Sequence, residues 1–288
     1  MYVFTRTKRD RPRNILIYGE HGSGKSTLAA QFPSPGVIDI EGGCDDIDVA
    51  TTKRIISYEE YEAAVNFLIS GPNVENATAI IDTVDWLEKL KQAQVARRLG
   101  KQSIEEIGFG KGFKIAAEDF EQGFVTGIRC LNSKGYRVVL LGHAKCVKHT
   151  PPGEAAFDRW EPDLHALVQS TILEFCDEVF FLKQEAFDKT EDAGFNKTRN
   201  LHVATARRVL VCSNNGSVVA KNRLGIVGEI DASWTAYNAA IQSAKARITQ
   251  KEQPRPVESD ISGIVVDDSS KPQYATEAGR ELAETFPA

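Results

Sequence analysis

Gly19-Glu20-His21-Gly22-Ser23-Gly24-Lys25-Ser26 fits the phosphate-loop spacing of a glycine, four residues and then Gly-Lys-Ser. Residues 14–18 before it, which are apolar after Asn14, predict a buried strand, and residues 27–32 after it predict the first turns of a helix. Its glycines let backbone N–H groups face an anion, while Lys25 can reach the β- and γ-phosphates and Ser26 can offer its hydroxyl to Mg²⁺. We therefore predict a nucleotide site from Gly19 to Thr27, rather than an ordinary glycine-rich turn.

The composition indicates a globular protein. A chain of 288 residues with 42% hydrophobic content can bury a full core as one large domain or as one domain with appendages. No run approaches the ~18 apolar residues of a membrane span, and the five cysteines form no Cys-x-x-Cys pair. We expect a protein of the bacterial cytoplasm with free thiols and no membrane partner. Its net charge of -5 argues against coating nucleic acid by charge alone.

Three further strands are expected to end in residues that suit a nucleotide site. The second, residues 37–40, leads into Glu41, and the third, residues 77–82, ends in Asp82. Glu41 could accept the proton of an attacking water, or it could belong to a Mg²⁺ shell or a turn. Asp82 is expected to hold a Mg²⁺-bound water opposite Ser26. The fourth strand, residues 136–143, ends in His143, which could sense the γ-phosphate.

Two predicted loops carry cations that could contact nucleic acid. Residues 107–114 combine glycines with aromatic and basic side chains that could stack on bases and neutralise phosphates of a single strand. Alternatively, this is a loop whose phenylalanines enter the core or a subunit contact. The second loop, residues 144–162, also admits a zinc interpretation through the spacing of His143, Cys146 and His149, but it offers no fourth ligand nearby. The DNA-binding candidates of the two loops are Phe109, Lys111, Phe113, Lys114, Lys145 and Lys148.

The remainder predicts a helix over 164–175, a fifth strand over 178–182, a polar loop over 184–200 and then a β-hairpin region. Its short strands are expected at 202–205, 208–211 and 217–220, and a last helix at 232–249. After the hairpin region, Lys221 and Arg223 share one face of a strand and could reach one phosphate together, or form a solvated basic end.

The expected domain organisation has three parts. A basic N-terminal arm, residues 1–13, precedes an ATPase domain, residues 14–249, and an acidic, flexible tail, residues 250–288. The tail could bind a partner such as a single-strand-binding protein, or it could be an idle linker.

Taken in order, these motifs resemble the RecA-type ATPase core, and most closely the phage P-loop proteins of the single-strand annealing and recombination group. The resemblance covers residues 12–248 and implies an α/β fold with a mostly parallel central sheet flanked by helices. It implies ATP as the nucleotide, Glu41 as the residue that activates water, Ser26 and Asp82 at Mg²⁺, and His143 as a sensor. It also implies that Lys221 and Arg223 act on the nucleotide of an adjacent protomer in a ring or filament.

The function expected from the sequence is a Mg²⁺-dependent ATPase that binds single-stranded DNA and promotes annealing or homologous recombination in a phage or prophage. Two alternatives remain. One is a DnaB-like helicase or helicase-loader ATPase, and the other is a nucleotide switch that acts independently of DNA.

Overall fold

The computed structural model describes residues 11–192 and 198–251. Most of the predicted N-terminal arm and of the acidic tail therefore lies outside the described residues. The strands are β1 (Asn14–Gly19), β2 (Pro35–Asp39), β3 (Ala50–Thr51), β4 (Thr78–Asp82), β5 (Arg137–His149), β6 (Phe157–Pro162), β7 (Glu178–Asp192), β8 (Thr198–Val211), β9 (Lys221–Asn222) and β10 (Glu229–Asp231). The α-helices are α1 (Lys25–Ala29), α2 (Tyr58–Ser70), α3 (Val84–Arg98), α4 (Lys111–Ser133), α5 (Ala166–Phe175) and α6 (Trp234–Lys251), with a 3-10 turn, η1 (Ile104–Glu106).

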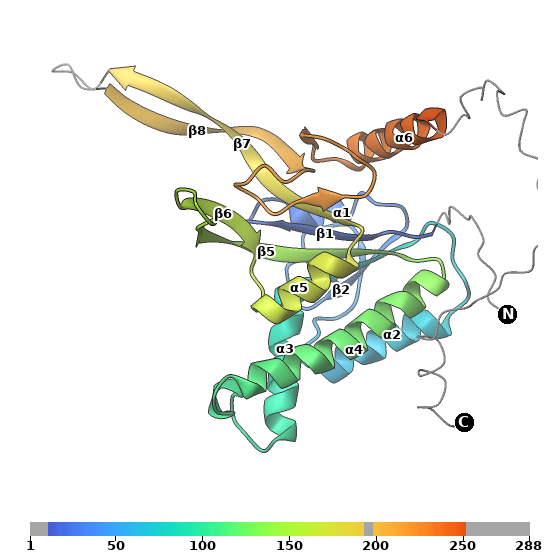
Figure 1. The fold of residues 1–288 in the computed structure, drawn as a ribbon. Helices are drawn as coiled ribbons and strands as arrows, with labels where there is room; N and C mark the ends of the chain where they lie inside the picture. The colour runs from blue at the N-terminus through green and yellow to red at the C-terminus, as the bar shows by residue number, and fades with distance from the viewer. Residues whose placement is uncertain (1–10, 193–197, 252–288) are drawn as a thin grey trace, which may run out of the picture. The chain divides into compact units, whose positions relative to one another are not determined.

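A mostly parallel sheet forms the centre of the fold, in the order β10-β8-β7-β1-β5-β4-β2-β3 (Figure 1). The six strands from β7 to β3 run parallel, and β8 and β10 add an antiparallel edge. Strands β1 and β4 are buried along their whole length, which explains their nearly continuous apolar sequences. The predicted α/β class with a mostly parallel sheet is confirmed.

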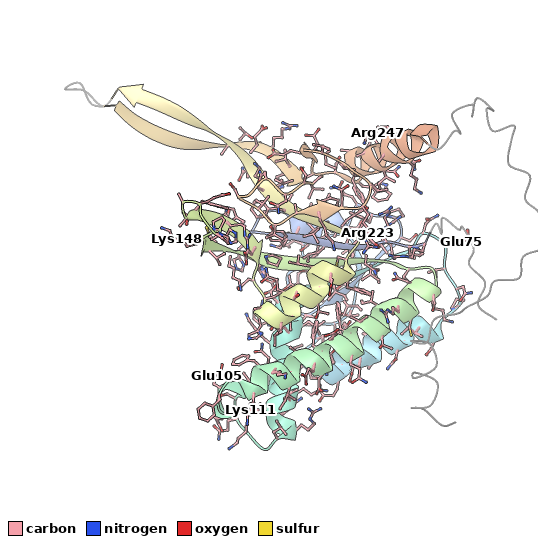
Figure 2. All side chains as sticks on the ribbon, viewed as in Figure 1. Glu75, Glu105, Lys111, Lys148, Arg223 and Arg247 are labelled. Atoms are coloured by element: carbon pink, nitrogen blue, oxygen red, sulfur yellow. The ribbon has the colours of Figure 1, made fainter. Side chains whose placement is uncertain are left out.

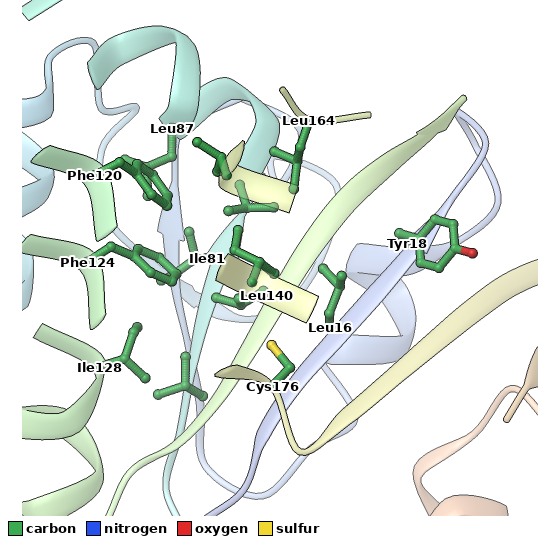
Figure 3. Packing of buried hydrophobic residues seen from close by; sticks show 14 of the residues in the cluster. Leu16, Tyr18, Ile81, Leu87, Phe120, Phe124, Ile128, Leu140, Leu164 and Cys176 are labelled. Atoms are coloured by element: carbon green, nitrogen blue, oxygen red, sulfur yellow. The ribbon is translucent and has the colours of Figure 1, made fainter. Parts of the chain in front are cut away.

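Helices cover both faces of this sheet, and each face has its own hydrophobic core. On one face, Phe120 and Phe124 of α4 pack in a cluster with Ile81 of β4 and Leu140 of β5 (Figure 3). On the other face, residues of α1 and α6 pack against the alternate side chains of β1, β5 and β7. The sheet is therefore held from both sides, which fixes the positions of its strand ends.

Two antiparallel hairpins replace loops that the sequence predicted. Strand β5 continues past His143 to His149 and pairs with β6, so the expected loop over 144–162 is wrong for most of its length. Strands β7 and β8 likewise pair over the segment expected to be a polar loop at 184–200. Figure 1 shows both hairpins extending beyond the helix-covered part of the sheet. In the β5–β6 hairpin, Ala144 and Trp160 pack against the α4-side core, but these apolar residues are too few and too irregularly spaced to predict a strand.

The segment predicted as a strand at 217–220 forms only an isolated bridge between Val218 and Trp160. Its apolar pattern has another cause, because Val218 and Ala220 are buried in the α4-side cluster. The backbone oxygen of Val219 accepts a hydrogen bond of 2.8 Å from the hydroxyl of Tyr18, which anchors the segment on β1.

Contacts divide the chain into two compact units, Met1–Ile248 and Thr249–Ala288. Within the first unit, the described end of the basic arm lies on the sheet. Arg11 pairs with Asp177 at 2.6 Å, and Arg13 pairs with the buried Glu178 at 2.8 Å.

Among the described helices, none combines the length and the apolar character that crossing a membrane requires.

Candidate nucleotide site

The strand order brings the predicted site residues to one edge of the sheet. Gly19, at the start of the phosphate loop, lies in register with His143 on the adjacent strand β5. Asp82, at the end of β4, lies opposite Asp39 of β2, two residues before Glu41. Parallel strands place their carboxyl ends together, and ligand sites in such sheets form at this edge.

The phosphate loop has the curled backbone that its glycines predict. Gly22 and Gly24 adopt φ values of 71° and 93°, a region that other residues enter at a cost. Lys25 is only 7% exposed, and its ammonium donates hydrogen bonds to the backbone oxygens of Gly19 at 3.2 Å and Glu20 at 3.0 Å. Burial lowers the pKa of Lys25, and the carboxylates near it partly offset this effect. A bound phosphate would give this buried ammonium a compensating anion.

The buried hydroxyl of Ser23 supports the same interpretation. Its oxygen has no hydrogen-bond partner among the described residues. Buried polar groups are ordinarily paired, so an unpaired hydroxyl within a phosphate loop fits a ligand that supplies the missing acceptor.

Ser26 and Asp82 form the pair expected at Mg²⁺. The Ser26 hydroxyl donates a hydrogen bond of 2.6 Å to the Asp82 carboxylate. Burial raises the pKa of Asp82 above its usual value, Ser26 opposes this rise, and the neighbouring carboxylates of Glu41 and Asp39 add to it. The Asp82 carboxylate has no cation in direct contact with it among the described residues. Together with the Ser26 hydroxyl, it offers the oxygen ligands that Mg²⁺ prefers.

His143 is held in place by Asp85, an acid in the first turn of α3. Asp85 accepts hydrogen bonds from the His143 backbone N–H at 3.1 Å and from the ring Nδ1 at 3.0 Å. Burial alone would raise the pKa of Asp85, but the hydrogen bonds and charge of His143 outweigh it and hold that pKa below its usual value. Asp85 therefore orients His143 and is not a helix cap, because the N-cap of α3 is Thr83.

The other ring nitrogen of His143, Nε2, faces Glu41, the residue expected to activate water. His143 Nε2 lies 3.5 Å from a carboxylate oxygen of Glu41, which is 29% exposed. His21 of the phosphate loop stacks on the His143 ring, with centroids 3.8 Å apart. The structure thus joins Glu41, His143 and the phosphate loop in one cluster that can respond to a ligand at this edge.

Arg208 is a site residue that sequence reasoning missed. A Cβ atom built on Gly24 would lie 3.2 Å from its guanidinium carbon, so this exposed side chain from β8 lies against the phosphate loop. Arg208 lies on β8, and the sequence gave no reason to expect this strand beside the phosphate loop. Neither Arg208 nor the Asp85–His143 pair has a local motif, because both depend on strand pairing between distant segments.

The second half of the first predicted DNA-binding loop, residues 111–114, is helical. Lys111, Phe113 and Lys114 belong to the first turn of α4, which begins after Gly110 with a φ of 70°. Phe113 stacks on His165 at 5.2 Å and packs beside a small buried cluster, which matches the alternative that it enters the core. Lys114 lies 3.7 Å from Glu118, a pairing of exposed side chains. Phe109 remains fully exposed in the preceding turn.

The second set of cations lies on the β5–β6 hairpin. Lys145 donates a hydrogen bond of 2.7 Å to the Leu164 oxygen, whereas Lys148 is exposed at the outer end of the hairpin (Figure 2).

The spacing of His143, Cys146 and His149, which admitted a zinc site, does not bring these three residues together as a cluster of metal ligands. His149 contacts Arg159 at 3.2 Å, and the metal-type cluster found among the described residues is instead His21, Glu41 and His143.

Lys221 and Arg223 lie at the other end of the sheet from the phosphate loop. Strand β9 pairs with the first residues of β7, Glu178 and Val179, whereas Gly19 pairs with Leu182 farther along β7. The Lys221 ammonium donates hydrogen bonds to the oxygens of Leu173 and Glu174, and Arg223 lies 3.2 Å from Asp177. Within one chain, these cations do not join the other site residues.

Comparison with known families agrees with this geometry. The model of a family described as an AAA domain matches residues 11–224. This range includes the phosphate loop and the candidate site residues Glu41, Asp82, His143, Lys221 and Arg223. A search among curated proteins finds no match. The family match indicates a nucleotide-binding domain of the ATPase type.

The buried Asp82 carboxylate leads to a stability prediction. Its raised pKa means that the folded, nucleotide-free protein favours the protonated carboxyl. Ionised Asp82 therefore lowers the free energy of unfolding, and this loss grows as pH rises from the unfolded-state pKa of about 4 to the folded-state pKa. We expect Asp82→Asn to raise the free energy of unfolding at pH 7 by about 1 kcal/mol, or 2–4 °C in Tm, and to abolish the further stabilisation by Mg²⁺ with ATP. Thermal unfolding with and without Mg²⁺ and ATP measures both effects.

The matched control is Asp163→Asn, because Asp163 is 53% exposed and pairs only loosely with Lys145. That variant should leave the unfolding temperature and the response to Mg²⁺ with ATP unchanged. An Asp82→Asn protein that is less stable than wild type, or still stabilised by Mg²⁺ with ATP, would contradict the assignment.

Proposed function

The chain belongs to the AAA domain family, and from that premise we propose that it is a RecA-like, Mg²⁺-dependent ATPase that binds single-stranded DNA. The observation that carries the ATPase proposal is the convergence of Lys25, Ser26, Glu41 and Asp82 at one sheet edge. The proposed biological role is annealing or homologous recombination in a phage or prophage.

Each residue of the site has a distinct task in the proposed hydrolysis. The phosphate-loop N–H groups and Lys25 bind the phosphates, and Arg208 adds a second cation against the same loop. Ser26 and Asp82 hold Mg²⁺, which when bound neutralises the charge on the phosphate oxygens. Glu41 accepts the proton of the attacking water, since its carboxylate is partly exposed at the same edge. Asp85 positions His143, which contacts Glu41 and transmits nucleotide state to the β5–β6 hairpin.

Lys221 and Arg223 support an oligomeric form of this enzyme. They cannot serve the nucleotide of their own chain, because β9 lies at the opposite end of the sheet. In a ring or filament, this end of one protomer would face the phosphate loop of the next, and Arg223, 58% exposed, could contact its nucleotide. The ATP site is therefore proposed to lie at a subunit interface.

The DNA-binding part of the proposal depends on exposed cations and one exposed ring. Lys111 at the start of α4 and Lys148 on the β5–β6 hairpin are both exposed, and Figure 2 shows them at the same side of the view. Phe109 is exposed and free to stack on a base. Lys148 lies on the strand that carries His143, so DNA bound there would be linked to the nucleotide site through β5. The acidic tail is proposed to bind a partner such as a single-strand-binding protein.

Hydrolysis of ATP with and without single-stranded DNA tests this function. We expect DNA to stimulate the rate, and the stimulation to fade as salt rises, because phosphate contacts release counterions. Lys148→Ala should reduce the stimulation and leave the DNA-free rate near that of wild type. The matched control is Lys53→Ala, which removes an exposed lysine near β3, away from the hairpin.

A rate that is indifferent to DNA would contradict the DNA-binding proposal and favour a nucleotide switch. Stimulation accompanied by duplex unwinding, or by loading of a helicase, would instead favour the DnaB-like alternative. Annealing of complementary strands that requires ATP would support the recombination role.

Mixing of variants tests the proposed interface. Arg223→Ala protomers keep an intact phosphate loop, and Lys25→Ala protomers keep an intact Arg223. If the arginine acts across the interface, a mixture should hydrolyse ATP faster than either variant alone. Initial rates over a range of mixing ratios measure this gain.

The control mixture combines Arg223→Ala with a Lys25→Ala, Arg223→Ala double variant, and it should show no gain. Co-assembly of each mixture is checked by sedimentation. Co-assembled protomers that show no rescue would contradict the role of Arg223 across the interface.

A further inference from the structure

A second set of possible metal ligands lies beside the proposed Mg²⁺ pair. One ring nitrogen of His21, one of His143 and a carboxylate oxygen of Glu41 all lie within 4.8 Å of one another. These residues come from the phosphate loop, from β5 and from the segment after β2. Their imidazole nitrogens distinguish this cluster from Ser26 and Asp82, which offer oxygen atoms only.

The hydrogen bonds of His143 to Asp85 leave its other ring nitrogen, Nε2, directed at the Glu41 carboxylate. Asp85 accepts from the His143 backbone through one oxygen and contacts ring Nδ1 through the other, so Nδ1 carries the hydrogen. In the neutral ring, Nε2 is then an acceptor, and it faces the Glu41 oxygen at 3.5 Å. In that form the two acceptors repel each other, and a cation between them, either a proton on Nε2 or a metal ion, turns the repulsion into attraction.

The same contacts form the support that bound metal ions ordinarily require. A histidine ligand usually donates its second ring N–H to a carboxylate, which fixes the tautomer and orientation of the ring. Asp85 supplies that carboxylate, and it is 4% exposed. His143 is therefore already oriented as a ligand through Nε2 before any metal binds.

The donor types select the class of metal. Two imidazoles and one carboxylate suit Zn²⁺ and related transition metals, whereas Mg²⁺ prefers oxygen ligands. Bonds of about 2.0–2.2 Å in a tetrahedral site place ligand atoms roughly 3.4 Å apart, so the cluster has to contract by somewhat more than 1 Å. His21 is exposed, so its ring can turn out of the stack with His143 to close that gap.

We propose that His21, Glu41 and His143 form a binding site for a divalent transition metal of the Zn²⁺ class, with Asp85 as the positioning residue. The fourth position of the ion is open to water. The metal site is distinct from the Mg²⁺ pair, although the two lie at the same edge of the sheet.

Metal binding at this site has a regulatory consequence, which rests on the proposed ATPase function. A Glu41 carboxylate that ligates a metal shares its negative charge with the cation, so it is a weaker base toward water. The metal-bound protein therefore hydrolyses ATP more slowly, and Zn²⁺ acts as an inhibitor through Glu41.

Titration of the full chain with Co²⁺, in the absence of nucleotide, tests the site directly. Co²⁺ replaces Zn²⁺ and gives visible ligand-field absorption when four-coordinate, and a nitrogen and oxygen site lacks the thiolate charge-transfer band that cysteine ligands would add. We expect one Co²⁺ per chain. His21→Ala and His143→Ala should each weaken binding at least tenfold, and Asp85→Asn should weaken it by about 10–100-fold.

His149→Ala is the matched control, because it removes a histidine from the same strand outside the cluster, and it should bind Co²⁺ as wild type does. Lys25→Ala separates the two proposals, since it should lose ATP binding and retain Co²⁺ binding. His21 is exposed, so loss of binding in its variant cannot be attributed to unfolding. In activity assays, Zn²⁺ should inhibit wild type more strongly than it inhibits His21→Ala, each relative to its own metal-free rate.

Absence of Co²⁺ binding, or binding that survives both histidine substitutions, would overturn the metal site. A charge-transfer band from a thiolate would overturn it as well, because it would place the ion on a cysteine. Co²⁺ binding in a protein that never hydrolyses ATP would leave the metal site standing and refute the ATPase proposal.

Discussion

The position of β1 between β5 and β7 is the constraint on which the site depends. This order places Gly19 beside His143 on one side and beside Leu182 on the other, so the phosphate loop starts from an interior strand of the parallel sheet. Hydrophobic packing on both faces holds these strands, and the backbone pairing sets their register. A slip of one residue in the register of a strand would separate residues that contribute to the same site. It would also turn the buried side chains of that strand to the opposite face of the sheet.

Burial makes the charges of this edge interdependent. Lys25, Asp82, Asp85 and His143 are each less than 8% exposed, and each has a polar partner within the cluster. Desolvation shifts the pKa of Lys25 downward and that of Asp82 upward, which means that both groups are less stable in their charged forms than in water. A phosphate near Lys25 and a cation near Asp82 would relieve both costs at once. The apo site thus favours a ligand that carries both charges.

The sequence predicted the parts of this arrangement that local patterns encode. The phosphate loop, the apolar strands before Glu41 and Asp82, and the strand that reaches His143 all have short-range features that the structure reproduces. The hairpins β5–β6 and β7–β8 were missed because their segments lack a regular alternation of apolar residues, so only the pairing between strands reveals them. Lys111 and Lys114 begin a helix where a loop was expected. Asp85, Arg208 and the contact of His21 with His143 depend on pairing between distant segments, which no local pattern records.

The central claim is that this edge of the sheet binds ATP with Mg²⁺ and hydrolyses it through Glu41. The most direct test compares ATP affinity and single-turnover hydrolysis in wild type, Glu41→Gln and Lys25→Ala. The account predicts that Glu41→Gln binds ATP nearly as wild type does and hydrolyses it about 10²–10⁴-fold more slowly, whereas Lys25→Ala loses binding. Normal turnover in Glu41→Gln, or normal ATP affinity in Lys25→Ala, would contradict it.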